Sequence, residues 1–407
     1  MFVLVIGLAV LFLCYGSVAH AGAVYSFTKT MGGSANDLGQ SVAVDSSGNV
    51  YITGYFRETM DFDPGAGTDN HTSAGLEDIF LTKINSDGSY GYTKTMGGTD
   101  HDYGQSVAID GSDNVYITGY FSGTDADFNI GGTADTHTSA GLEDIFLTKI
   151  NSDASYGYTK TMGGTDHDYG QSVAIDGSDN VYITGYFRGT ADFDPGSATD
   201  NHASAGEEDI FLTKINFDGS YDLTETMGGT DHDYGQSVAV DDSVNVYLTG
   251  SFRGTADFNP GAGTDDHTAD EEDIFLTKFR LVGFVVTPAS VTTTGAGGTT
   301  TFTVRLLSEP LANVTLPVSS SNLTIGTVDT SSLTFTTINW SVDQTVTVTS
   351  LVGSSQTYSI MLGATSSADA DYDGLNPTDV TVGIVGNDSG GSGGCFIATA
   401  AYGSPLT

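Results

Sequence analysis

The sequence of residues 39–56, GQSVAVDSSGNVYITGYF, decides the fold. Val42 and Val44 alternate with small and polar residues, turn-forming residues fill positions 45–49, and β-branched and aromatic residues resume at Val50. This is the pattern of a strand, a tight turn and a second strand. Repetition at an almost constant spacing predicts a repeat architecture. Three near copies of this hairpin begin at Gly104, Gly170 and Gly235.

Each repeat contains two further segments with the character of strands. The sequence DIFLTKI occupies 78–84, 144–150 and 209–215, and its apolar residues fall on both faces of a strand, so both faces are expected to be covered. The sequence YGYTKTMGG follows at 90–98 and 156–164. Four short antiparallel strands per repeat are typical of a β-propeller blade. The sequence therefore predicts an all-β fold with a propeller of four blades, each of about 65 residues.

The two ends of the repeat array predict how the propeller closes. Residues 25–33 have the sequence of a fourth strand without a preceding repeat, and the last repeat ends after 273–279 without a fourth strand. We expect the N-terminal strand to complete the fourth blade, because an unclosed array leaves strand edges open to aggregation. The alternatives are an open arc, or a larger ring completed by another chain.

Composition divides the chain into five parts. The apolar run from Phe2 to Cys14, followed by Ala19-His20-Ala21, predicts a signal peptide over 1–21 and therefore export. The propeller is expected over 22–281. Residues 282–388 are rich in Thr, Val and Ser with period-2 alternation, and about seven such strands predict an immunoglobulin-like β-sandwich. Residues 389–394 predict a flexible Gly/Ser linker, and 395–407 form a tail.

Three motifs resemble known bacterial families. Residues 45–54, DSSGNVYITG, resemble the D-x-S-G-N-V-Y-x-T-G signature of SBBP propeller repeats, which implies a propeller fold and a surface location. The later copies depart from this signature at its Gly, where Asp113, Asp179 and Val244 stand, and this concerns only the turn type. Residues 302–320 and 370–382 resemble Calx-β and related immunoglobulin-like modules.

The C-terminal tail carries the third motif. Residues 395–404, CFIATAAYGS, resemble the CFI-box at the C-terminal end of many bacterial exported proteins. In those relatives more chain follows, so the motif here is expected either to be cut short or to act alone. Cys14 lies in the predicted signal peptide, which leaves Cys395 without an intrachain partner. We expect Cys395 to serve processing or anchoring; the alternative is a disordered tail with a free thiol.

The net charge limits the kinds of partner. The chain has 51 acidic residues against 12 Lys and Arg, a formal charge of −39. Nucleic acids and anionic membranes both require a basic surface, so neither is an expected partner. Such acidity suits an extracellular setting with abundant divalent cations, or serves solubility alone.

Two groups of acidic residues are candidates for calcium. Asp369, Asp371 and Asp373 match the opening D-x-D-x-D-G of a calcium loop. An EF-hand is not expected, since Val380 stands at the position of its bidentate Glu; Asp379 is a further candidate ligand. Asp also favours turns for local reasons, by hydrogen-bonding its own backbone. The weaker candidates, in the propeller loops, are Asp61, Asp63, Asp69, Asp192, Asp194 and Asp200.

The sequence offers little for catalysis. It has no nucleophile elbow, no Gly-rich phosphate loop before a helix and no CxxC motif, and first strands bearing Ser41, Val42 and Ala43 would line the channel with few acids or bases. The loop histidines are expected to be solvated; the alternative is a transition-metal or hydrolytic site. They are His71, His101, His167, His202, His232 and His267.

The predicted function is therefore that of a secreted or cell-surface binding scaffold of the adhesion type. Repeated loops on a rigid propeller would present an acidic face to an extracellular protein or glycan, with Ca²⁺ as the only expected cofactor. The alternatives are a calcium-stabilised structural component of an envelope or matrix, and a propeller hydrolase acting on extracellular polymers.

Overall fold

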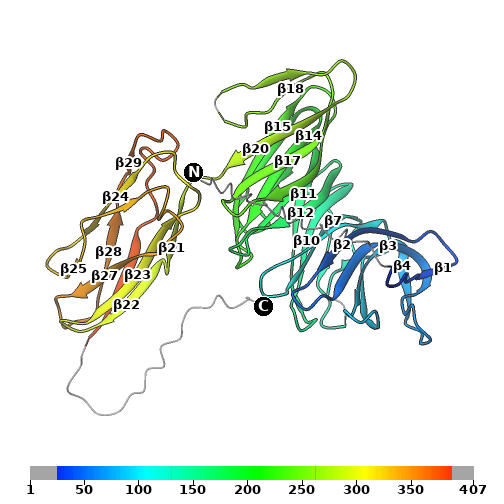
Figure 1. The fold of residues 1–407 in the computed structure, drawn as a ribbon, viewed down its shortest axis with the longest axis horizontal. Coiled ribbons are helices and arrows are strands. Elements are labelled where there is room, and N and C mark those ends of the chain that lie inside the picture. Colours follow the sequence, from blue (N-terminus) through cyan, green and yellow to red (C-terminus); the bar gives the residue numbers. More distant parts are fainter. Residues whose placement is uncertain (1–24, 130, 262, 387–407) are drawn as a thin grey trace, which may run out of the picture.

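The computed structural model describes residues 25–386, except 130 and 262. The predicted signal peptide, the Gly/Ser linker and Cys395 lie outside the described residues. Every regular element in the described part is a strand (Figure 1). None of the described segments is a helix long and apolar enough to cross a membrane.

The first three repeats each form a four-stranded antiparallel unit. The first is built from β2 (Leu38–Val44), β3 (Val50–Asp61), β4 (Asn70–Ile84) and β5 (Tyr90–Met96). The second consists of β6 (Asp102–Ile109), β7 (Val115–Ser122), β10 (Glu143–Ile150) and β11 (Tyr156–Gly164), with the short β8 (Ala126–Asp127) and β9 (Thr136–His137). The third consists of β12 (Asp168–Ile175), β13 (Val181–Asp192), β14 (Asn201–Ile215) and β15 (Tyr221–Gly229).

The fourth repeat has three main strands. They are β16 (Asp233–Val240), β17 (Asn245–Phe252) and β20 (Asp273–Arg280), and the short β18 (Thr255–Asp257) and β19 (Asp266–Thr268) extend the β17–β20 connection. The first strands of successive blades contact one another in the order β2, β6, β12, β16. The four blades follow one another as an arc, from the first blade in blue to the fourth in green (Figure 1).

Apolar residues on facing strands hold neighbouring blades together. Ile79 and Leu81 in the third strand of the first blade are buried against Val107 in the first strand of the second. Phe128, from the connection between the second and third strands of the second blade, packs into the same apolar layer. This packing explains the two-sided apolar pattern of DIFLTKI in the second and third blades, because their third strands lie between two blades. The next two junctions repeat it with Ile145, Leu147, Val173 and Phe193, and with Ile210, Leu212, Val238 and Phe258.

The pairing at the ends of the arc corrects one prediction. β1 (Gly32–Gly33) pairs with β3 of the first blade, and within the described residues β20 pairs only with β17. Residues 25–33 therefore do not complete the fourth blade. The reason is that the Gly-Gly segment of a repeat forms hydrogen bonds with the end of the second strand in the following blade. Gly163–Gly164 bind β13 in this way, and Gly32–Gly33 bind β3 in the same way.

The C-terminal domain consists of two sheets around one core. One sheet has the order β21 (Phe284–Thr287), β23 (Thr299–Leu306), β27 (Gln344–Ser350), β25 (Gly326–Val328). The other has the order β22 (Ser290–Thr294), β30 (Val380–Val385), β28 (Gln356–Leu362), β24 (Val314–Ser320), β26 (Ser332–Phe335), and β29 (Ser366–Ser367) pairs with β24. Phe302, Trp340 and Tyr372 are buried in this core.

Candidate functional site

Six tyrosine rings form one continuous ladder across the four blades. Within the second blade Tyr103 and Tyr120 are opposite each other on paired strands, and Tyr169 and Tyr186 repeat the pair in the third. Between blades, the ring in the second strand meets the ring in the next first strand edge-on. Centroid distances along the row Tyr55, Tyr103, Tyr120, Tyr169, Tyr186, Tyr234 are 4.6, 4.9, 4.5, 5.0 and 4.7 Å.

A histidine and a glutamate flank the ladder at each junction between blades. The imidazole of His101 stacks on Tyr103 at an interplanar angle of 7°, and its Nδ1 lies 2.6 Å from Oε2 of Glu77 in the preceding blade. The other two junctions repeat this group. The equivalent residues are His167, Tyr169 and Glu143, and His232, Tyr234 and Glu208.

The ladder is accessible and its phenols keep their protons. The side chains of His101, His167 and His232 are 46, 37 and 36% exposed, so the row opens to solvent along its histidine edge. Burial and the charge of Glu77 raise the pKa of Tyr103 well above its usual value, and burial raises the pKa of Tyr120 to about 12. At neutral pH these hydroxyls can therefore donate hydrogen bonds to a ligand.

Pairs of buried aspartates lie at the same junctions. Asp78 and Asp102 flank Gly97, where any side chain would collide with both carboxylates. Oδ2 of Asp78 accepts a hydrogen bond of 2.9 Å from the Ala74 amide, whereas Oδ1 is buried without a partner. Burial raises the pKa of both carboxyl groups to about 7. The equivalent pairs are Asp144 with Asp168 and Asp209 with Asp233.

The calcium candidates of the first and third blades cap turns and bind neighbouring side chains. Oδ1 of Asp61 accepts from the amides of Asp63 and Asp69, and Oδ1 of Asp63 accepts from Gly65. Asp69 Oδ2 contacts both His71 and the Tyr90 hydroxyl. This is the local role that Asp has in turns, and calcium binding here stays a prediction. Asp192, Asp194 and Asp200 repeat the contacts, with His202 and Tyr221.

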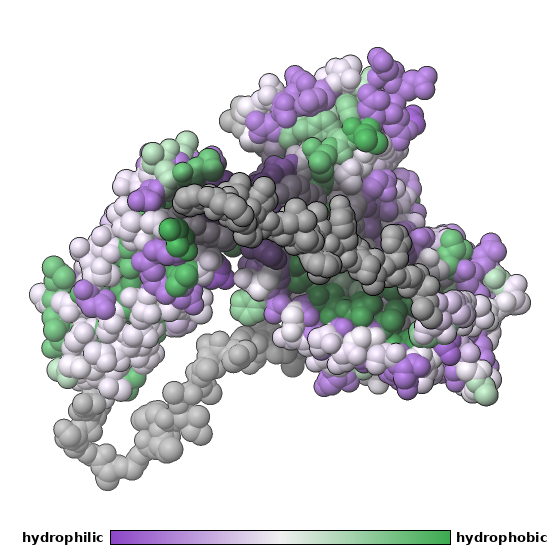
Figure 2. Space-filling view, in the orientation of Figure 1, coloured by the Kyte–Doolittle hydropathy of each residue, from purple (hydrophilic) through white to green (hydrophobic). Residues whose placement is uncertain are grey.

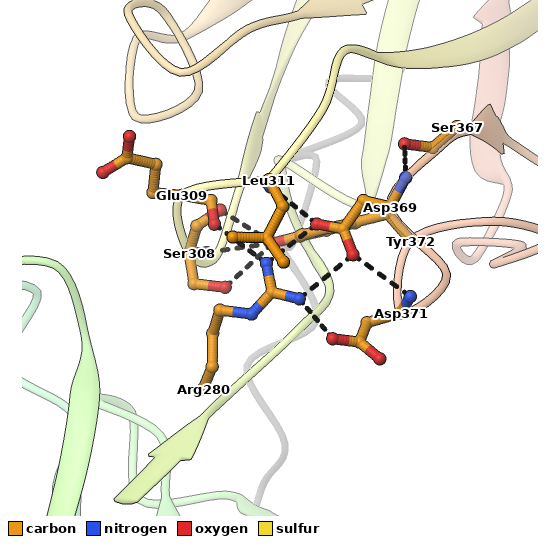
Figure 3. A network of polar contacts seen from close by, with 8 residues as sticks. All are labelled: Arg280, Ser308, Glu309, Leu311, Ser367, Asp369, Asp371 and Tyr372. Atoms are coloured by element: carbon orange, nitrogen blue, oxygen red, sulfur yellow. Dashed lines mark hydrogen bonds and ion pairs between the residues drawn. The ribbon is translucent and has the colours of Figure 1, made fainter.

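The calcium candidates of the C-terminal domain face an arginine. Arg280 at the end of β20 donates to both carboxylate oxygens of Asp369 and to Asp371 (Figure 3). Asp373 accepts from the Ser367 amide at 3.0 Å, and Asp379 accepts from the Leu362 amide at the same distance. A calcium ion at Asp369 and Asp371 would have to compete with the guanidinium group. Calcium binding stays a prediction here too.

The sequence contains a signal for the ladder that local motifs alone do not show. Tyrosine recurs in the DYG and TGY segments of the repeats, and only Leu38 and Ser251 interrupt the series, at its two ends. Ser41, which was expected to line the propeller channel, joins two blades: its hydroxyl oxygen accepts a hydrogen bond from the Val107 amide of the next blade. The loop histidines, expected to be solvated, are paired with carboxylates and do not gather into one site.

One further cluster has the residue types of a metal site. Among the described residues, Glu207, Glu208 and His232 are the one group of three whose ligand atoms all lie within 4.8 Å of one another. However, Glu207 is ion-paired with Arg188 at 2.7 Å, and the first two repeats have Leu76 and Leu142 at its position. The other two histidine junctions therefore lack this third ligand.

Comparisons with known proteins agree with the propeller fold. A family model described as a beta-propeller repeat matches residues 28–55. An uncharacterized WD repeat-containing protein of Acanthamoeba polyphaga mimivirus is 26% identical over 302 residues, which cover 60% of this chain and 21% of the viral protein. A regulatory protein, FlaEY, of Caulobacter vibrioides is 25% identical over 248 residues, 58% of this chain and 24% of that protein. The chain thus spans less than a quarter of the length of these relatives. Its repeats are of the β-propeller type.

Proposed function

We propose that this protein is a non-enzymatic binding scaffold that acts outside the cell, and that its ligand lies along the tyrosine ladder. The observation that carries the proposal is the unbroken row of six rings from Tyr55 to Tyr234, flanked by half-exposed imidazoles. Tyrosine combines a large apolar face with a hydroxyl group, and it is enriched at binding surfaces for this reason. Export rests on the predicted signal peptide.

The chemistry of the ladder favours a neutral glycan chain. The group of tyrosine, histidine and glutamate recurs at each junction, so a polymer of repeated units would meet the same contacts several times. Sugar rings can stack on the aromatic faces, while Glu77 and its equivalents accept hydrogen bonds from sugar hydroxyls. The formal charge of −39 disfavours anionic polymers.

The alternatives receive less support from the geometry. A hydrolase needs an acid or base that a substrate can reach. The carboxyl groups whose pKa lies near 7, such as Asp78 and Asp102, are buried between blades, where a substrate has no access. A purely structural role in an envelope or matrix gives no reason for an accessible row of rings.

The test is quantitative binding to a panel of soluble neutral and anionic polysaccharides, measured by titration calorimetry. Tyr120 and Tyr169 form the central contact of the ladder at 4.5 Å, so Tyr120→Ala and Tyr169→Ala should each weaken binding of a neutral glycan at least tenfold. Phe217→Ala is the matched control, because Phe217 is an exposed aromatic residue on a turn away from the ladder. Circular dichroism would verify that each variant is folded.

Two outcomes would overturn the proposal. One is binding of a neutral glycan that is unchanged in both ladder variants, which would place the ligand elsewhere. The other is binding of a purified protein partner, or of anionic polymers, with no neutral glycan bound. Tyr120→Phe separates the contribution of ring stacking to binding from that of the hydroxyl hydrogen bond, because it keeps the ring and removes only the hydroxyl.

A further inference from the structure

The two ends of the propeller arc expose the residues that every internal junction buries. In the fourth blade Ile274 and Leu276 are 87 and 75% exposed, whereas their equivalents Ile79 and Leu81 are buried under the next blade. In the first blade Val42 is 63% exposed, whereas the equivalent valines of the later blades are buried. The exposed faces are therefore the two halves of one missing blade junction. In Figure 2 hydrophobic surface is visible both on the fourth blade at the top and near β2 at the lower right.

The fourth blade also has an unfilled strand position. A groove of 1220 Å³ runs along β20 from Asp273 to Arg280. In the other blades a fourth strand lies there, paired in one register: Ile79 opposite Met96, and Thr82 opposite Thr93. The threonine hydroxyls of that pair are hydrogen-bonded at 2.8 Å. Among the described strands, none pairs with this edge of β20.

Residues 25–31 have the matching sequence and lie at the other end of the arc. Their sequence YSFTKTM corresponds to YGYTKTM of β5, so the same register would place Met31 opposite Ile274 and Thr28 opposite Thr277. In the structure Met31 packs on the core of the first blade. Phe27 lies close to Gly88, as Tyr158 lies close to Gly219 at an internal junction. The segment thus occupies the position of a fourth strand that precedes the first blade.

We propose that a second copy of the chain fills this position: residues 25–31 and the first blade of one copy dock on β20 of the other, and the reverse contact closes a ring. Residues 25–33 are fixed to their own first blade, and the first and fourth blades lie at opposite ends of the arc (Figure 1). Two arcs of four blades give a ring of about eight, within the usual range for propellers. The contact continues the blade junction that the chain already makes three times, and its closure avoids open filaments.

The test combines molar mass with disulfide trapping in the full chain, with Cys14 and Cys395 changed to Ser. Light scattering should give the mass of two chains. Thr28→Cys with Thr277→Cys should form an intermolecular disulfide under mild oxidation, because the two residues would face each other. Lys29→Cys with Thr277→Cys is the matched control: Lys29 would be opposite Leu276, one residue out of register, and should cross-link far more slowly.

A surface variant tests the apolar contact separately. Leu276→Asp should shift the mass to one chain without unfolding, because Leu276 is exposed within a single copy. Ile338→Asp is its control, since Ile338 is 89% exposed in the C-terminal domain. A monomer in which Thr28→Cys and Thr277→Cys join within one chain would overturn the proposal and show closure by the chain's own N-terminal strand. A monomer in which these cysteines form no disulfide, either between chains or within one chain, would also overturn the two-chain ring. A series of larger polymers would do the same.

Discussion

Arg280 and Asp369, which are 89 residues apart in the sequence, form a bidentate ion pair between the propeller and the C-terminal domain. Nη1 donates to Oδ2 at 2.8 Å and Nη2 donates to Oδ1 at 3.1 Å. Asp369 is buried, and the Leu311 amide also donates to it at 2.7 Å. The hydrogen bonds from Arg280 lower the pKa of Asp369 to about 2. The pair is thus a charged link between the fourth blade and the C-terminal domain.

Arg280→Ala should destabilise the C-terminal domain by about 3 kcal/mol, because it leaves the Asp369 carboxylate buried without its counter-charge. The measurement is chemical unfolding followed by the fluorescence of Trp340, which lies in that domain. Arg253→Ala is the control, since its ion pair with Glu272 is exposed to solvent and should contribute little to stability. Equal effects of the two substitutions would contradict a special role for Arg280.

The buried aspartate pairs predict that stability falls as the pH rises from about 4 to about 7. Their pKa values in the folded chain, about 7 for Asp78 and Asp102, lie above the ordinary value of 3.8. The folded state therefore binds more protons in this window, and the stabilisation is lost as the pH passes the folded pKa. Asp369 acts in the opposite direction, but only below about pH 4, because its pKa is lowered.

Asp78→Asn tests this pH dependence, since the amide is neutral at every pH and keeps an acceptor for the Ala74 amide. The thermal midpoint of the parent should be several degrees lower at pH 8 than at pH 5, and Asp78→Asn should raise the midpoint at pH 8 and flatten the profile. Asp87→Asn is the control on an exposed turn. An unchanged profile in Asp78→Asn would contradict the assignment.

Gly119→Ala should destabilise the propeller by about 2 to 3 kcal/mol, through overpacking between the first and second strands of the blade. A Cβ at this position would collide with the carbonyl oxygen of Tyr103 and come within 3.0 Å of Phe146. Gly177→Ala is the matched control, because a Cβ there has no neighbour within 4 Å. Thermal unfolding of both variants gives the comparison, and similar midpoints would refute the close-approach argument.

Calcium binding at Asp369, Asp371 and Asp373 can be tested against the competing guanidinium group. In millimolar Ca²⁺ compared with EDTA, the thermal midpoint of Arg280→Ala should rise by several degrees, and more than that of the parent, because the cation replaces the lost charge. Adding Asp371→Asn and Asp373→Asn should abolish the rise. A rise that survives these changes would move the calcium to the propeller loops, and no rise in any variant would reject calcium as a ligand of the protein.

The repeat pattern predicted the all-β repeat units correctly, whereas the predicted closure of the ring by residues 25–33 was wrong. The four hairpins, DIFLTKI and YGYTKTM form the predicted strands because alternation and turn residues act locally. The tyrosine ladder was missed, because Tyr55 and Tyr103 belong to different repeats and meet only when blades stack. Similarly, Asp369 and Asp371 were predicted as calcium ligands from their spacing, which contains no information about Arg280.

The sequence by itself determined the all-β character, the number of repeats and the strands within each, because these depend on the order of apolar, polar and turn-forming residues along short segments. Only the tertiary structure decided how the array ends. Gly32 and Gly33 pair with the first blade, and Ile274 and Leu276 are left exposed on the fourth. The physical reason is that a fourth strand can pair with any third strand of matching register, and the choice among them depends on the curvature of the stacked blades.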